Sequence, residues 1–130
     1  MALTPQKPKR SKDMEVQAIT KNIRMSAQKM REVVRQIQGL GAEHAQAVLA
    51  VVPRKGARFV AKTLKSAIAN AEDLKTHKKE YSGLMTERLR IKEAVAQTAS
   101  TLRRFTPKAR GSAGPILKRS CHIKIVLTDQ

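Results

Sequence analysis

The hydrophobic pattern at the start of the chain predicts one strand followed by one helix. Apolar and polar residues alternate from Met14 to Ala18, as in a strand with one buried face, and the alternation breaks at Ile19, where we expect a bulge. Ser26 is a suitable N-cap for a helix that Gly39 ends. The apolar residues of this helix fall at helical spacing: Met30, Val33, Val34 and Ile37.

Two more helices are predicted in the middle of the chain. The shorter one has an apolar stripe of Ala45, Val48, Leu49 and Val52, and Pro53 closes it or opens the next helix. The longer one runs from about Arg54 to Leu74 and has two different faces. Its apolar face carries Val60, Leu64, Ala67, Ile68 and Ala71, and its cationic face carries Arg54, Arg58, Lys62 and Lys65.

The pattern changes to strands in the C-terminal part of the chain. Residues 75–85 are polar and are expected to form a loop, after which Leu89, Ile91 and Val95 alternate with basic residues, as in a half-buried strand. This strand leads into a hairpin whose tip is rich in Gly and Pro. The returning arm alternates Cys121, Ile123, Ile125 and Leu127.

The hairpin is expected to be long. Arms of about 15 residues, at roughly 3.3 Å per residue, would extend on the order of 50 Å from the base. A lone two-stranded hairpin is marginally stable in water. We therefore expect a large anionic partner to hold it.

The order of these elements predicts an α+β fold. Three helices would pack on one face of a small three-stranded antiparallel sheet, with the long β-hairpin, at about residues 98–120, protruding from it. Residues 14–130 are expected to form a single RNA-binding domain that includes the hairpin. Residues 1–13 have no apolar periodicity and are expected to be a flexible basic tail.

The charge of the chain narrows the choice of partner. It has 27 Lys and Arg against 10 Asp and Glu, a formal net charge of +17, and no acidic residue between Glu93 and Asp129. Such an excess is typical of proteins that bind nucleic acid or an anionic membrane. A membrane-active peptide would place aromatic residues opposite its cations, which this sequence does not do. The chain has no run of about 18 apolar residues and no signal-peptide segment after Met1, so we expect a soluble cytoplasmic protein.

Catalysis and metal binding have little support in the sequence. His44, His77 and His122 lie far apart, without acidic or thiol companions at the spacing of metal ligands, and no paired acid and base is present. Cys121, the only cysteine, alternates with inward-facing residues and is expected to be a buried apolar residue. We therefore expect no enzyme, no metal site and no cofactor.

RNA binding is the function that the charge pattern favours, since the cations leave the apolar stripes free to form a core. The three aromatic residues, Phe59, Tyr81 and Phe105, do not cluster, so we expect recognition of the shape and backbone of folded RNA rather than base stacking. The alternative is a free basic RNA chaperone or nucleoid protein. Such a protein would not need a long hairpin.

Three segments in matching order carry a family resemblance. They are residues 26–31 (Ser-Ala-Gln-Lys-Met-Arg), residues 65–72 (Lys-Ser-Ala-Ile-Ala-Asn-Ala-Glu) and residues 103–127. They resemble the first helix, the third helix and the hairpin of the ribosomal large-subunit protein L-twenty-two family (universal L-twenty-two), bacterial type. Matching hairpin positions include Arg104, Pro107, Ala109, Gly111, Ala113, His122, Ile123 and Ile125.

The resemblance implies a non-catalytic structural protein that binds 23S rRNA, supports its assembly and extends a hairpin to the nascent-peptide exit tunnel. The implied partners are large-subunit rRNA, neighbouring large-subunit ribosomal proteins and the nascent polypeptide, with macrolide antibiotics nearby and no membrane. The implied rRNA-binding residues are Lys7, Lys9, Arg10, Lys12, Arg24, Lys29, Arg31, Arg58, Lys62, Lys65, Arg103, Arg104, Lys108, Lys118 and Arg119. The implied tunnel-lining tip is Lys108, Ala109, Arg110, Gly111, Ser112, Ala113 and Gly114.

The hairpin also departs from the family pattern. Thr98-Ala99-Ser100 stands where Glu-Gly-Pro is usual, and Lys108 stands where Arg is usual. Ser112, Gly114 and Pro115 occupy positions where Arg, Asp and Arg are common, so the tip loses charge. Pro115 also removes a backbone donor from the returning arm.

Overall fold

The structure is built around a central strand, β5 (Cys121–Thr128). The computed structural model describes residues 14–129. In these residues β5 pairs antiparallel with β1 (Glu15–Ile23) on one side and with β2 (Arg90–Thr98) on the other. Its side chains alternate between buried and half-buried over the first five residues, as the sequence predicts.

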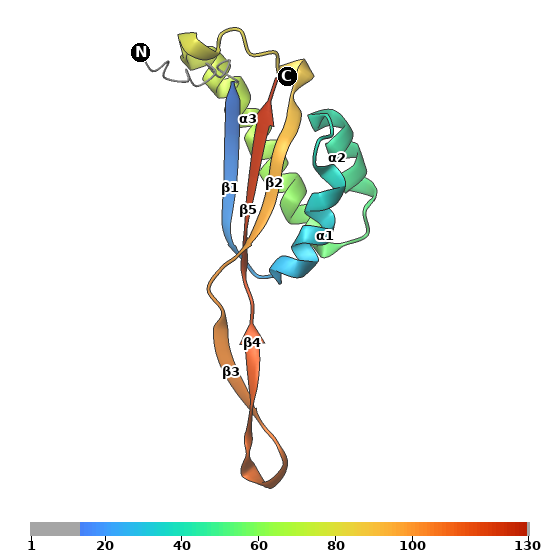
Figure 1. Ribbon diagram of the computed structural model, residues 1–130, viewed down its shortest axis with the longest axis vertical. Coiled ribbons are helices and arrows are strands. Elements are labelled where there is room, and N and C mark those ends of the chain that lie inside the picture. Colours follow the sequence, from blue (N-terminus) through green and yellow to red (C-terminus); the bar gives the residue numbers. More distant parts are fainter. Residues whose placement is uncertain (1–13, 130) are drawn as a thin grey trace, which may run out of the picture.

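Three helices cover one face of this sheet (Figure 1). α1 (Ala27–Ile37) packs against β2, α3 (Lys55–His77) packs against β1 and β5, and α2 (Ala42–Val51) packs against α3. The apolar stripes of the helices meet the sheet in one core, and the predicted α+β architecture is confirmed. Fully buried core residues include Met30, Ile37, Leu64, Ile91, Ile123, Ile125 and Leu127.

The hairpin protrudes from one end of the sheet and consists of β3 (Leu102–Pro107) and β4 (Ala113–Lys118) (Figure 1). Its strands have six residues each, roughly 20 Å at 3.3 Å per residue, so the expected arms of about 15 residues are too long. The reason is that the parts of both arms nearest the domain, β2 and β5, belong to the domain sheet. None of the helices in residues 14–129 packs against β3 or β4, and the side chains of these strands are mostly exposed.

Two bulges, one in β1 and one in β2, place side chains on other faces than the sequence predicted. Ile19 continues the alternation of β1 and is 49% exposed, and the irregularity lies instead between Thr20 and Ile23. In β2 the register shifts between Ile91 and Glu93, so Val95, predicted to lie on the buried face, is only half-buried. One extra residue in a strand moves the following side chains to the opposite face. Ala94 and Ala96 are buried in its place.

The third helix is longer than predicted, ending at His77 instead of Leu74. Side chains support its last turn: Thr76 Oγ1 donates to Glu72 O (3.0 Å), and His77 Nδ1 lies 3.1 Å from Asp73 Oδ1. The following polar segment is not a featureless loop. It contains two short 3-10 turns, Lys79–Tyr81 and Thr86–Arg88.

Replacing Ile125 by Ala should lower the free energy of unfolding by about 2–5 kcal/mol, because Ile125 is fully buried on the central strand and the truncation leaves a cavity. The matched control is Ile19→Ala on β1, where the side chain is 49% exposed and the loss should stay below about 1 kcal/mol. Urea unfolding followed by circular dichroism measures both. Equal losses would contradict this core assignment.

The buried thiol of Cys121 should make stability depend on pH. Burial raises the pKa of Cys121, so the thiol stays protonated in the folded chain at a pH where it ionises in the unfolded chain. The stability of the wild type relative to Cys121→Ala should therefore be constant below about pH 8 and decrease as the pH rises through the ordinary thiol pKa of about 8.5. Urea unfolding at a series of pH values measures this difference. Parallel profiles for the two proteins would contradict the prediction.

Candidate nucleic-acid interface

The cations of the hairpin are exposed and have no counter-charge. Arg103, Arg104 and Lys118 lie on β3 and β4, and Arg119 directly follows β4; all four are exposed. Within residues 14–129 no ion pair reaches them. In the part of the chain that the structure describes, the only hydrogen bond that these four side chains make runs from Arg104 Nη1 to Arg103 O (2.7 Å). Positive charge is therefore available to a partner along the whole arm.

Acidic residues of the domain neutralise cations elsewhere. On the sheet face opposite the helices, Glu15 pairs with Lys92, and Glu93 Oε2 lies 3.5 Å from Lys124 Nζ. Glu32 on α1 pairs with Arg54, a residue that the sequence placed on the cationic face of α3. These pairs remove charge from the sheet and from the α1–α3 junction.

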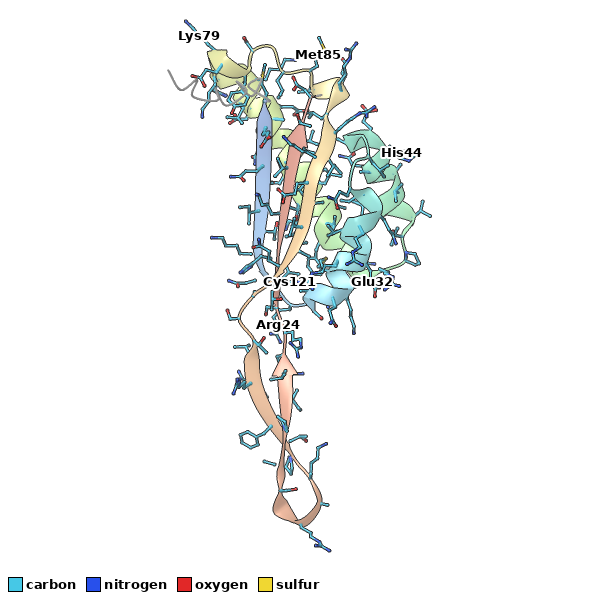
Figure 2. The ribbon with its side chains drawn as sticks, viewed as in Figure 1. Arg24, Glu32, His44, Lys79, Met85 and Cys121 are labelled. Carbon is cyan, nitrogen blue, oxygen red and sulfur yellow. The ribbon has the colours of Figure 1, made fainter. Side chains whose placement is uncertain are left out.

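The base of the hairpin is a second cationic region, and it comes from a segment without acidic residues between Glu15 and Glu32. Arg24 follows β1, and Figure 2 shows it at the point where the hairpin leaves the domain. Its Nη1 donates to Lys118 O (3.3 Å) and lies 3.4 Å from Ser120 Oγ. Arg24 therefore fixes the base of the returning arm in addition to carrying charge.

Arg31 on α1, like Arg24, both carries charge and holds the structure together near the base of the hairpin. Its Nε donates to Ala96 O of β2 (3.1 Å), which ties α1 to the strand that feeds the hairpin. Next to it lies a small surface cavity of about 210 Å³. The cavity is lined by polar and basic residues from both sides of the junction, among them Ser26, Gln28, Arg31, Thr98, Arg119 and Ser120.

The helices present the remaining predicted cations. Arg58, Lys62 and Lys65 lie four and three residues apart on α3 and are exposed, so they form one cationic face as predicted. Lys29 on α1 is also exposed. The predicted contacts Lys7, Lys9, Arg10 and Lys12 lie outside the described residues.

The tip of the hairpin is closed by its own hydrogen bonds. Lys108 N donates to Ser112 O (2.6 Å), and Ser112 donates to Ala109 O through both its backbone N (3.3 Å) and its Oγ (2.9 Å). Arg110 and Gly111 turn the chain with φ of 57° and 70°. Ser112 thus stabilises the turn through its hydroxyl.

At the tip, the side chain of Lys108 fills the space that a side chain at position 114 would need. A Cβ added to Gly114 would lie 2.3 Å from Lys108 Cε and 2.8 Å from its Cδ. The aliphatic part of Lys108 therefore covers Gly114, which is buried. A larger residue at position 114 would therefore displace the lysine side chain.

The three histidines do not come together in a catalytic or metal-binding group in the part of the chain that the structure describes. His44 and His77 are exposed, and His122 Nδ1 accepts a hydrogen bond from Asn22 N (3.0 Å). Among residues 14–129 no three His, Cys, Asp or Glu side chains form a group that could hold a metal ion. None of the helices described here is long and apolar enough to cross a membrane.

Two features of the interface were missed in the sequence. The first is the meeting at the base of the hairpin of four cations that were each expected to bind rRNA: Arg24, Arg31, Lys118 and Arg119. They come from α1 and from the ends of β1 and β4 and meet only in the fold; the acid-free segment before Glu32 was the available signal. The second is Phe105, which is 77% exposed in the middle of the cationic arm.

Comparison with known proteins gives one consistent family. Residues 18–128 match the family described as "Ribosomal protein L22p/L17e". The "Large ribosomal subunit protein uL22" of Opitutus terrae is 49% identical over 116 residues, covering 89% of this chain and 96% of that protein. Its counterparts from Methylacidiphilum infernorum and Akkermansia muciniphila are 46% and 44% identical over 117 residues, covering 90% of this chain and 96% and 98% of those proteins.

These matches cover the helices, the sheet and the hairpin together. The chain therefore belongs to the ribosomal protein L22p/L17e (uL22) family, and it is a structural, non-enzymatic protein of the large ribosomal subunit.

Proposed function

We propose that this chain binds large-subunit (23S) rRNA through two surfaces, the cationic face of its domain and its hairpin, and thereby supports the folding of the RNA during subunit assembly. The observation that carries the proposal is the acid-free, exposed and unpaired set of cations on an arm that no other part of the domain covers. A lone hairpin is marginally stable in water, and a surrounding polyanion would stabilise this one by pairing with its cations.

The domain and the hairpin would contribute differently. Arg58, Lys62 and Lys65 on α3, with Lys29 on α1, would contact phosphates on the outside of the RNA. The arm would enter a channel between RNA segments, where Arg103, Arg104, Lys118 and Arg119 face phosphates on several sides. Arg24 and Arg31 would orient the arm, since both donate to backbone carbonyls at its base.

The tip would line the nascent-peptide exit tunnel, at residues 108–114. Its support is the position at the far end of the arm (Figure 1) together with four small, exposed residues that leave room for a passing chain: Ala109, Gly111, Ser112 and Ala113. The partners would be rRNA, neighbouring large-subunit proteins and the nascent polypeptide in the cytoplasm, with macrolide antibiotics bound near the tip. The closed turn at Lys108–Ser112 would keep the tip in one shape.

Ribosomes from the source cells should retain the chain through a high-salt wash. After separation of the subunits on a gradient, quantitative mass spectrometry should find about one copy per large subunit, because a threaded arm is not released by screening alone. Loss of the chain into the wash would contradict the proposal and favour a free RNA chaperone.

The same proposal predicts the salt dependence of binding to large-subunit rRNA. The double variant Arg103→Gln with Arg104→Gln should flatten the slope of log K against log salt by about one to two units, because each lost phosphate contact removes about 0.7–0.9. The control is Lys75→Gln with Lys78→Gln, the same charge change at the C-terminal end of α3, which should leave the slope unchanged. Equal slopes for the two double variants would contradict a special role of the arm.

A further inference from the structure

Phe105 is exposed in a way that needs an explanation. Of the three aromatic residues in the chain, Phe59 and Tyr81 are partly buried against the core, whereas Phe105 on β3 is 77% exposed. An exposed phenyl ring leaves a large apolar area in contact with water. Its position, in the middle of an arm whose charged residues are all basic, suggests that the ring is covered when the arm meets its partner.

The register of the hairpin places the ring on a defined face. Phe105 lies directly opposite Pro115, and Arg103 lies opposite Leu117. Residues directly opposite each other, and residues two apart along a strand, share one face of a hairpin. This face, which we call the Phe105 face, consists of Arg103, Phe105, Pro107, Ala113, Pro115 and Leu117, and all six residues are exposed.

The opposite face has a different character. It carries Arg104 and Lys118, and its centre is partly covered because the Lys108 stem lies over Gly114 and Ile116 is half-buried. The Phe105 face has only one charged residue, Arg103. One face of the arm therefore carries two cations among uncharged residues, and the Phe105 face carries a single guanidinium among apolar residues.

The chemistry of the Phe105 face suits a nucleotide. An aromatic ring can stack on any nucleobase, and an arginine can contact the phosphate that belongs to the same nucleotide. Arg103 and Phe105 are two residues apart on one face, which separates them by about 6.6 Å along the strand. Pro115, opposite Phe105, has no freely rotating side chain and forms a firm apolar support beside the ring.

We propose that Phe105 stacks on an unpaired nucleobase of the large-subunit rRNA, with Arg103 on the adjoining phosphate. The charge of the arm favours this partner over an apolar protein pocket, because every charged residue of the arm is basic and its cations would have no counter-charge in such a pocket. The inference rests on the proposed rRNA binding and adds one contact with a base to contacts that are otherwise with the backbone.

Substitutions at position 105 separate stacking from apolar contact. Phe105→Ala should weaken binding to large-subunit rRNA from the source cells by about 5- to 150-fold, the range for loss of one base–aromatic stack. Phe105→Leu keeps apolar volume but loses the π face and should weaken binding nearly as much. Phe105→Tyr keeps the ring and should bind within about threefold of the wild type.

The control variant is Leu102→Ala, which removes an apolar side chain, 45% exposed, from the opposite face of the same strand. It should change binding by less than threefold, since about 0.6 kcal/mol corresponds to that factor. Because Phe105 and Leu102 lie outside the core, all variants should keep the thermal unfolding of the wild type. If a variant is less stable, its thermal unfolding midpoint will be lower, so a loss of stability can be told apart from a loss of binding.

A tryptophan at position 105 gives a direct spectroscopic test, because the natural chain has no tryptophan. The fluorescence of Phe105→Trp should be strongly quenched when rRNA is added, whereas that of Met85→Trp, at an exposed position that Figure 2 shows at the end of the domain away from the hairpin, should change little. A blue shift without quenching at position 105 would indicate an apolar protein or sugar environment and would overturn the stacking contact. An unchanged spectrum with intact binding would overturn it as well.

The two levels of the proposal fail differently. If the wild type binds the rRNA and Phe105→Ala binds equally well, the stacking contact is wrong and the rRNA-binding function stands. If Phe105→Leu equals the wild type while Phe105→Ala is weaker, the ring makes an apolar contact and no stack. If the wild type shows no saturable binding, the proposed function fails and the stacking contact fails with it.

Discussion

The pairing of β5 on both of its sides is the interaction on which the rest of the structure depends. β1 and β2 hold it in register, α1 and α3 cover its inner face, and the same chain direction continues through Ser120 into the hairpin. Since Ala99 N donates to Ser120 O (3.0 Å), the two arms stay joined where they leave the sheet. The sheet thus fixes the direction in which the hairpin extends, although the hairpin has no core of its own.

The distribution of charge follows this architecture. Acidic residues lie on the sheet, on the helices and at the end of the domain away from the hairpin, and several of them pair with nearby cations. The arm and its base have none, and the fold brings Arg24 and Arg31 together with the basic residues that precede β5. A large-subunit rRNA would supply the missing counter-charge, so the protein and its proposed partner complete one another electrostatically.

Most of the fold could be predicted from hydrophobic periodicity, because the stripes of α1 and α3 and the alternation of β5 are regular. The faces of β2 could not, since the bulge after Ile91 is a property of pairing and not of composition. The same limit applies to the site. Arg58, Lys62 and Lys65 follow from helical spacing, whereas the exposure of Phe105 and the fit of Lys108 over Gly114 depend on the register of the hairpin.

The central claim is that the domain sheet fixes the direction of the hairpin and that contact with rRNA stabilises its strands. Hydrogen exchange of backbone amides, measured for the free protein and for its complex with large-subunit rRNA, tests this claim most directly. We expect slow exchange in β5 in both states, fast exchange in β3 and β4 of the free protein, and strong protection of β3 and β4 in the complex. Equally slow exchange of the arm in the free protein, or no added protection in the complex, would contradict the account.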